Sequence, residues 1–134
     1  IKGTLFGGPP ARATRFILNM ENCVFCKIIK GEIPTEFLYQ DEDIVAFRDI
    51  NPSAPVHILI VPKKHIEKLQ VVSDNEKSLL GQALLVAKKI AEGEKITQSG
   101  YKVCLNCGEG AGQIVPHLHF HLLGGWKEEG GCLC

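Results

Sequence analysis

The segment His117–Leu123 alternates histidine with large apolar residues, and it limits what this chain can fold into. Side chains of a β-strand point to opposite faces in turn, so strict alternation predicts a strand. The alternation places all three imidazoles on one face and turns Leu118, Phe120 and Leu122 into the core. Three histidines within about 14 Å of strand suit neither a core nor an ordinary solvent face. The pattern therefore indicates a catalytic or ligand-binding site.

Two kinds of site use histidines in this arrangement. One is a metal site, because His-x-His on a strand can chelate an ion. The other is a phosphate site with a nucleophilic imidazole. A glycine-rich loop, Gly108–Gly112, lies just upstream, and glycines let backbone N–H groups approach an anion and form a nest. The adjacency of this loop to the histidines favours the phosphate site.

The other segments predict an α+β domain with a mostly antiparallel sheet of about five strands, one main helix and a short N-terminal helix. The short helix is expected at Cys23–Lys30, ending at Gly31. The main helix is expected to begin at the Ser73/Glu76 capping box and to run to about Gly93. Its predicted buried face is Leu80, Ala83, Leu84, Ala87, Ile90 and Ala91. The remaining predicted strands are Phe37–Tyr39 and Ile44–Phe47 as a hairpin, His57–Val61 in the sheet centre, and Tyr101–Asn106.

Composition excludes several classes of protein. The chain has 134 residues with 15 Lys+Arg, 15 Asp+Glu and a net charge of zero, which argues against binding nucleic acid through its phosphates. Only 7% of residues are aromatic, too few for a base-stacking platform. No apolar run approaches the roughly 18 residues that a membrane helix needs. No secretory signal is visible, so the six cysteines favour a reducing, cytoplasmic location.

The ends of the chain differ from its centre. Residues 1–19 contain three basic residues and no acid, and they precede the single methionine, Met20. We expect a leader or tag-like extension at 1–19, with a basic organellar presequence as the alternative. One domain is expected at 20–126, and a Gly- and Cys-containing tail at 127–134.

The histidine segment closely resembles the histidine triad (HIT) family and its Hint-like branch, whose pattern is His-φ-His-φ-His-φ-φ. The resemblance extends from about Cys23 to Gly125. Supporting matches are Ile33-Pro34, Ala46–Ile50, Ala54-Pro55, Ile60–Ile66, Ser78–Gly81, Gly100-Tyr101 and Leu122–Gly125. The resemblance implies a HIT-like five-stranded sheet and a homodimer.

The resemblance also implies hydrolysis of nucleoside 5′-phosphoramidates or related nucleotidyl adducts at the α-phosphorus, as in purine nucleoside phosphoramidases. His119 would be the nucleophile, with His121 and His117 as the other triad members. A neutral imidazole is a good nucleophile and leaving group, so it can split one displacement into two. A purine nucleotide resembling AMP or GMP would be bound by Phe47, Asp49, Ile50, Asn106, Gly112 and Gln113.

One position departs from the family pattern. Ile114 stands where Hint proteins usually carry a serine that helps to protonate the leaving group. This departure leaves open a dinucleoside polyphosphate hydrolase and a nucleotide-binding module with little turnover. A metal-dependent hydrolase that uses the histidines around a catalytic zinc is a third alternative.

The resemblance further implies a structural zinc ion and no organic cofactor. Some family members bind zinc through residues equivalent to Cys23, Cys26, His65 and His117, a donor set that suits a closed tetrahedral site. The alternative is that Cys23 and Cys26 are plain buried thiols. Cys104 and Cys107 are not expected to bind one ion together. Cys132 and Cys134 are expected to be free thiols in the tail, with an oxidative cross-link as the alternative.

Overall fold

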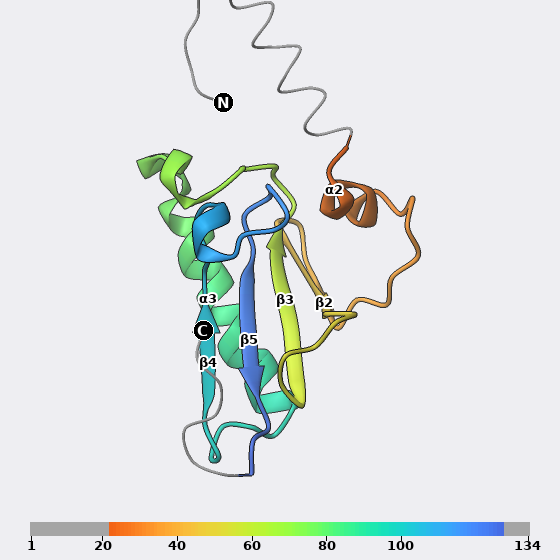
Figure 1. The fold of residues 1–134 in the computed structure, drawn as a ribbon, viewed down its shortest axis with the longest axis vertical. Helices are drawn as coiled ribbons and strands as arrows, with labels where there is room; N and C mark the ends of the chain where they lie inside the picture. Colours follow the sequence, from red (N-terminus) through yellow and green to blue (C-terminus); the bar gives the residue numbers. More distant parts are fainter. Residues whose placement is uncertain (1–21, 128–134) are drawn as a thin grey trace, which may run out of the picture.

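Five antiparallel strands form one sheet in the order β1-β2-β3-β5-β4 (Figure 1). The computed structural model describes residues 22–127, so the expectations for 1–19, for nearly all of 127–134 and for Cys132 and Cys134 lie outside it. The elements in chain order are α2 (Val24–Ile29), β1 (Tyr39–Gln40), β2 (Ile44–Arg48), β3 (Val56–Pro62), η1 (Leu69–Val71), η2 (Asp74–Glu76), α3 (Lys77–Gly93), β4 (Tyr101–Cys104), η3 (Glu109–Ala111) and β5 (Phe120–Gly124). The predicted α+β class, with β3 in the sheet centre, is confirmed.

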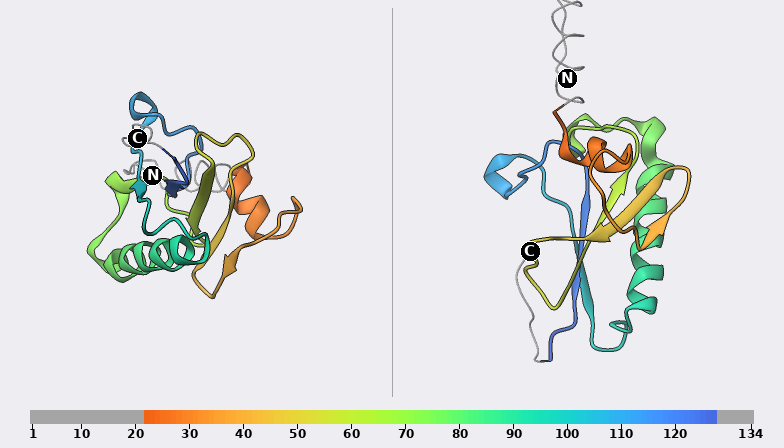
Figure 2. Two further views of the ribbon diagram at one scale, coloured as in Figure 1. Left: turned by 90° about the horizontal axis from the view of Figure 1, so that it is seen from below. Right: turned by 90° about the vertical axis from the view of Figure 1, so that its right-hand side faces the viewer.

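The helices α2 and α3 cover opposite faces of the sheet (Figure 2). Alternate residues of a strand point to opposite faces, and Ile58 and Ile60 of β3 pack with α3 whereas Leu59 and Val61 pack with α2. The helix α3 therefore closes the larger apolar core, and α2 closes a smaller one that lies on the histidine side of β5.

The histidine strand is shorter than predicted, because β5 begins only at Phe120. Phe120 pairs with Ile60, so Leu118 would be opposite Pro62 if the register continued. The carbonyl of His57 accepts a backbone hydrogen bond from Asp49, the residue that follows β2, so by alternation the even-numbered residues of β3 bond to β5. Pro62 has no N–H to donate, and the ladder ends there. The prediction of strand at 117–119 is therefore wrong.

Two other predicted strands are also shorter. The strand β4 ends at Cys104, opposite His121, rather than at Asn106. The strand β1 contains only Tyr39 and Gln40, paired with β2 in the predicted hairpin.

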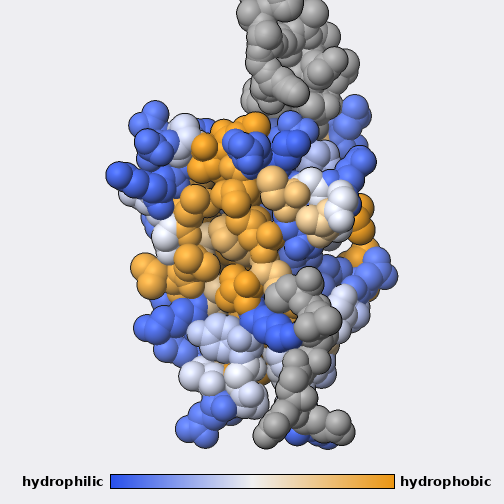
Figure 3. All heavy atoms as spheres, turned by 60° about the vertical axis from the view of Figure 1, so that its left-hand side comes forward, coloured by the Kyte–Doolittle hydropathy of each residue, from blue (hydrophilic) through white to orange (hydrophobic). Residues whose placement is uncertain are grey.

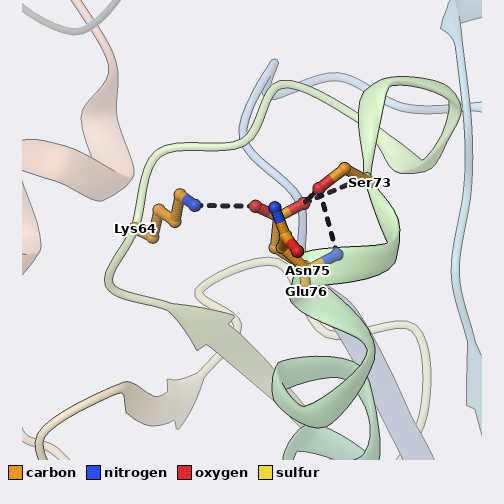
Figure 4. Close-up of polar contacts among 4 residues, drawn as sticks. All are labelled: Lys64, Ser73, Asn75 and Glu76. Carbon is orange, nitrogen blue, oxygen red and sulfur yellow. Dashed lines mark hydrogen bonds and ion pairs between the residues drawn. The ribbon is translucent and has the colours of Figure 1, made fainter.

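The start of the main helix is the predicted capping box (Figure 4). The Ser73 hydroxyl accepts the Asn75 N–H at 3.2 Å, and the Ser73 N–H donates to Glu76 Oε1 at 2.7 Å. Lys64 Nζ lies 2.7 Å from Glu76 Oε2, and these bonds from Lys64 and Ser73 lower the pKa of Glu76 to about 2. The first turn is the 3₁₀ segment η2, after which α3 runs to Gly93 as expected.

The buried face of α3 consists of Ala83, Val86, Ala87, Ile90 and Ala91. Leu80 is only partly buried, although it packs against this core. Leu84 is 51% exposed, so its predicted burial is wrong and Val86 takes its place. The observed set has the i, i+3, i+4, i+7, i+8 spacing of one helix face, and Leu84 lies one residue off that face. Figure 3 brings the β4 side of the molecule forward and shows hydrophobic residues gathered there. Leu84 and Leu85 of α3 and Leu69 and Val71 of η1 are all at least partly exposed.

Within residues 22–127, no helix has the length and apolar content needed to cross a bilayer.

Candidate functional site

The ring of His119 is buried and held in one tautomer. It is 7% exposed, and its Nδ1 lies 2.7 Å from the carbonyl oxygen of His117. A carbonyl only accepts, so Nδ1 carries the proton and Nε2 keeps its lone pair. Burial lowers the pKa of His119 below 6.5, because removal from water disfavours the charged form. His119 is therefore a neutral imidazole with one free basic nitrogen.

His121 is held in the opposite tautomer through His57. The Ser53 N–H donates to His57 Nδ1 at 2.9 Å, so the proton of neutral His57 is on Nε2. His57 Nε2 lies 2.9 Å from His121 Nδ1 and donates to it. The proton of His121 is then on Nε2, where it can be donated to a ligand. Burial and the neighbouring His119 and His57 lower the pKa of His121 to about 4.

His57 is a site residue that sequence reasoning missed. The sequence predicts only that it lies in a buried central strand, and it is indeed 6% exposed. Burial lowers the pKa of His57, although the Asp49 carboxylate, 3.5 Å from its Nε2, acts in the opposite direction. The available signal was a histidine within an otherwise apolar strand, on the face shared by Leu59 and Val61.

A cavity of about 610 Å³ opens beside these histidines. The predicted residues that line it are Phe47, Asp49, Ile50, Asn106, Gly112, His119 and His121. Residues not predicted to do so include Val24, Phe25 and Ile28 of α2, together with Ile33, Pro34 and Val115. Ile50 and Ile114 also line it although they are 91% and 90% exposed. The cavity is therefore largely apolar with polar groups near the histidines, as is common for sites that bind small molecules.

Gln113 is not among the residues that line this cavity. Its Oε1 accepts the Gly108 N–H at 2.8 Å, and its Nε2 donates to the carbonyls of Glu67 and Val115. This amide therefore fixes the shape of the glycine-rich loop.

The glycine-rich loop itself uses much of its backbone internally. The N–H groups of Gly108, Ala111, Gly112 and Gln113 all donate within residues 108–113. In contrast to the expected nest, these four groups are not available to an anion. Gly108 and Gly112 have φ values of 94° and 93°, which explains glycine at both positions.

A second cluster brings together Cys23, Cys26, His65 and His117, the four residues implied as zinc ligands. Cys23 Sγ lies 3.3 Å from His117 Nδ1, and Cys26 Sγ lies 3.2 Å from His65 Nδ1. The two Nδ1 atoms are 3.2 Å apart. The ring of His117 is fully buried in this cluster, so it faces the cysteines and does not line the cavity.

The donors of this cluster fit a tetrahedral cation. Bonds of about 2.3 Å to sulfur and about 2.0–2.1 Å to nitrogen place the donors of a tetrahedron roughly 3.3–3.8 Å apart, close to the distances above. His117 Nε2 lies 2.8 Å from the Pro62 carbonyl and donates to it, so Nδ1 presents a lone pair to the cysteines. Burial and Cys23 raise the pKa of Cys26 to about 12, so thiolates here need a positive charge for stabilisation.

The HIT domain family profile matches residues 30–128, most of the described chain. This chain belongs to the HIT domain family. The match confirms the resemblance inferred from the histidine segment, and the five-stranded sheet with one main helix is the HIT fold.

Relatives within the HIT family cover most of the chain. It is 48% identical to the purine nucleoside phosphoramidase of Escherichia coli strain K12, over 78% of this chain and 88% of that protein. The structure superimposes on a HIT family hydrolase from Legionella pneumophila Philadelphia 1 with a TM-score of 0.77 and 49% identity, covering 79% of this chain and 95% of that one. A HIT family hydrolase from Clostridium thermocellum gives a TM-score of 0.80 at 48% identity, with coverage of 84% and 98%.

Proposed function

We propose that this HIT protein is a nucleotidyl hydrolase that cleaves nucleoside 5′-phosphoramidates through a covalent nucleotidyl-His119 intermediate. The observation that carries the proposal is the tautomer of His119, whose Nδ1–H is bound to the His117 carbonyl while its Nε2 is free beside the cavity. The name of the Escherichia coli relative, purine nucleoside phosphoramidase, supports the substrate class.

In the first step, His119 Nε2 attacks the α-phosphorus and the P–N bond breaks. The amine leaves with a proton from solvent, because the side chain of Ile114 has none to give. The nucleotidyl-imidazolium keeps its Nδ1–H on the His117 carbonyl. Water then attacks phosphorus, which releases the nucleoside monophosphate and restores neutral His119. The Nε2–H of His121 would stabilise charge on the phosphoryl oxygens in both steps.

The remaining predicted residues would bind the nucleotide. Phe47 and Ile50 supply apolar surface for a purine, and Asn106 and Gly112 line the cavity near the loop. Asp49 Oδ1 already accepts the Asn51 N–H at 2.8 Å, but a carboxylate has further lone pairs for ribose hydroxyls. Gln113 would contribute by shaping the loop.

The covalent step can be tested by quenching turnover of adenosine 5′-phosphoramidate with alkaline denaturant, since the P–N bond of a nucleotidyl-histidine is hydrolysed in acid, followed by intact-protein mass spectrometry at neutral or alkaline pH. An adenylyl adduct on wild-type protein that is absent from His119→Ala supports the proposal. Turnover without any adduct, at quench times shorter than one cycle, contradicts it. Diadenosine polyphosphates in parallel test the alternative substrate class, and AMP binding without turnover would indicate a binding module.

A metal-dependent hydrolase is the second candidate, because Asp49, His57 and His121 place three donor atoms within 4.8 Å of one another. The hydrogen bond from Ser53 argues against it, since it places the proton of His57 on Nε2 and leaves no lone pair there for a metal. A rate that returns only when a divalent cation is restored to chelated protein whose fold is unchanged would favour this candidate.

We further propose a homodimer, a structural zinc ion in the Cys23/Cys26 cluster and a cytoplasmic location. The strand β4 is at the sheet edge, and a second copy would cover it together with Leu84 and Leu85. A reducing compartment would preserve the thiols of Cys23 and Cys26, which are free in the structure. Light scattering that gives a monomer mass at micromolar concentration would contradict the dimer.

A further inference from the structure

The Cys23/Cys26 cluster and the cavity share one short helix, α2. Cys23 is its N-cap and Cys26 lies in its first turn, and both belong to the cluster. Val24, Phe25 and Ile28 of the same helix line the cavity. One wall of the cavity is therefore built on residues adjacent to the cysteines.

Phe25, between the two cysteines, contacts the reacting histidine. Its ring is 6% exposed and meets the ring of His119 edge to face, with centroids 5.0 Å apart and planes at 88°. It meets Phe47, proposed above for the base, in the same way at 5.7 Å and 76°. Phe25 thus supports the nucleophile and the base pocket from one side.

The helix α2 is held in place mainly by its side chains. It has six residues, and isolated helices shorter than about 12–15 residues are marginal in water. It joins no strand ladder and packs through Phe25, Cys26 and Ile28 against β2 and β3. A cation in the cluster would bond α2 to His65, which follows β3, and to His117, which precedes β5.

We propose that Phe25 is a positioning residue through which zinc in the Cys23/Cys26 cluster sets the affinity for nucleotide. With zinc bound, α2 is fixed, and Phe25 holds the rings of His119 and Phe47. Without zinc, α2 is held only by its apolar contacts and by the weak thiol–imidazole hydrogen bonds of Cys23 and Cys26, and the cavity wall is less firmly fixed. This inference rests on the proposed function, because the ligand it concerns is the nucleotide.

The test measures AMP affinity by calorimetry on zinc-loaded and chelated wild-type protein. We expect one zinc per chain and an affinity at least about tenfold weaker after chelation, restored by added zinc. Cys26→Ser should behave like the chelated protein. Cys107→Ser is the matched control, because Cys107 is a free cysteine outside the cluster and does not line the cavity. It should behave like wild type.

A second pair of variants isolates the role of the ring. Phe25→Ala should keep its zinc but bind AMP about tenfold more weakly, and chelation should then change affinity by less than threefold. Phe37→Ala is the control, because Phe37 packs on Phe47 in the same apolar cluster but does not line the cavity. Its AMP affinity should still depend on zinc as in wild type.

Different results would overturn the inference and the proposed function. An AMP affinity that differs by less than twofold between zinc-loaded and chelated protein overturns the inference and leaves the proposed function standing. A protein that binds AMP but no zinc has the same two consequences. If zinc-loaded wild type does not bind AMP, the proposed function fails. Amide exchange then tests the inference separately: equal exchange of residues 23–30 with and without zinc overturns it.

Discussion

The two faces of the sheet differ in the kinds of side chain that cover them. The α3 face is an apolar core of residues such as Ile58, Ile60 and Ala87, closed by a helix with a complete capping box. The α2 face places cysteines, histidines and a cavity over the other side of the same strands. Burial alone accounts for the first face, whereas the second depends on fixed histidine tautomers and carries a Cys/His cluster that could hold a cation. The comparison predicts that substitutions on the α3 face change stability and that those on the α2 face change chemistry.

The largest expected effect is on the α2 face. His119→Ala should lower turnover by several orders of magnitude, since removal of a covalent nucleophile abolishes the two-step route. AMP binding and the thermal midpoint should change little, because Phe47 and Asp49 remain. Steady-state kinetics and calorimetry check this. A variant that retains more than a tenth of the wild-type rate would contradict the covalent mechanism.

On the α3 face, Ile60→Ala should reduce the free energy of unfolding by about 2–5 kcal/mol. Ile60 is fully buried, and its loss leaves a cavity between β3 and α3. Urea denaturation gives the free energy, and the rate per folded molecule should remain close to that of wild type. A large loss of rate in the folded fraction would show that the two faces are not independent.

Acid should lower the stability of the protein through the histidines on the α2 face. The pKa of His57 lies below 6.5 and that of His121 is about 4, so the unfolded chain binds more protons at these sites as pH falls below 6.5. Stability therefore decreases from pH 6.5 to about 4 and changes little further from this source below pH 4. Urea denaturation across this range should show a shallower decrease in His121→Gln. If the free energy of unfolding of that variant decreases as steeply with pH as that of wild type, groups other than His121 cause the loss of stability in acid.

The smallest effect is expected at the capping box before α3. Ser73→Ala removes the side-chain acceptor of the capping box and should cost about 0.5–2 kcal/mol of stability. Turnover should be unaffected, because Ser73 does not line the cavity. Denaturation and kinetics on the same preparation check both statements.

The regular parts of the molecule could be predicted from local patterns. Alternation predicted the strand from Phe120 onward, and the Ser73/Glu76 pair located the start of the main helix. His57 could not be assigned a role in this way, because its partner His121 is 64 residues away and their proximity depends on strand order. The internal bonding of Gln113 likewise depends on Glu67, 46 residues away.

Pro62 has a consequence beyond the end of a strand. In a longer ladder, its carbonyl would accept the Leu118 N–H, but Leu118 donates to the Ile66 carbonyl instead. The Pro62 carbonyl is thereby left to the imidazole of His117. An imino acid that cannot donate a hydrogen bond thus selects which nitrogen of a histidine on the neighbouring segment is basic. Exchange of Pro62 for a residue with an N–H would allow the ladder to continue, so that the Leu118 N–H would compete with His117 Nε2 for the carbonyl oxygen of residue 62. If His117 lost that bond, its Nδ1 would no longer be fixed as the nitrogen that presents a lone pair to the cysteines.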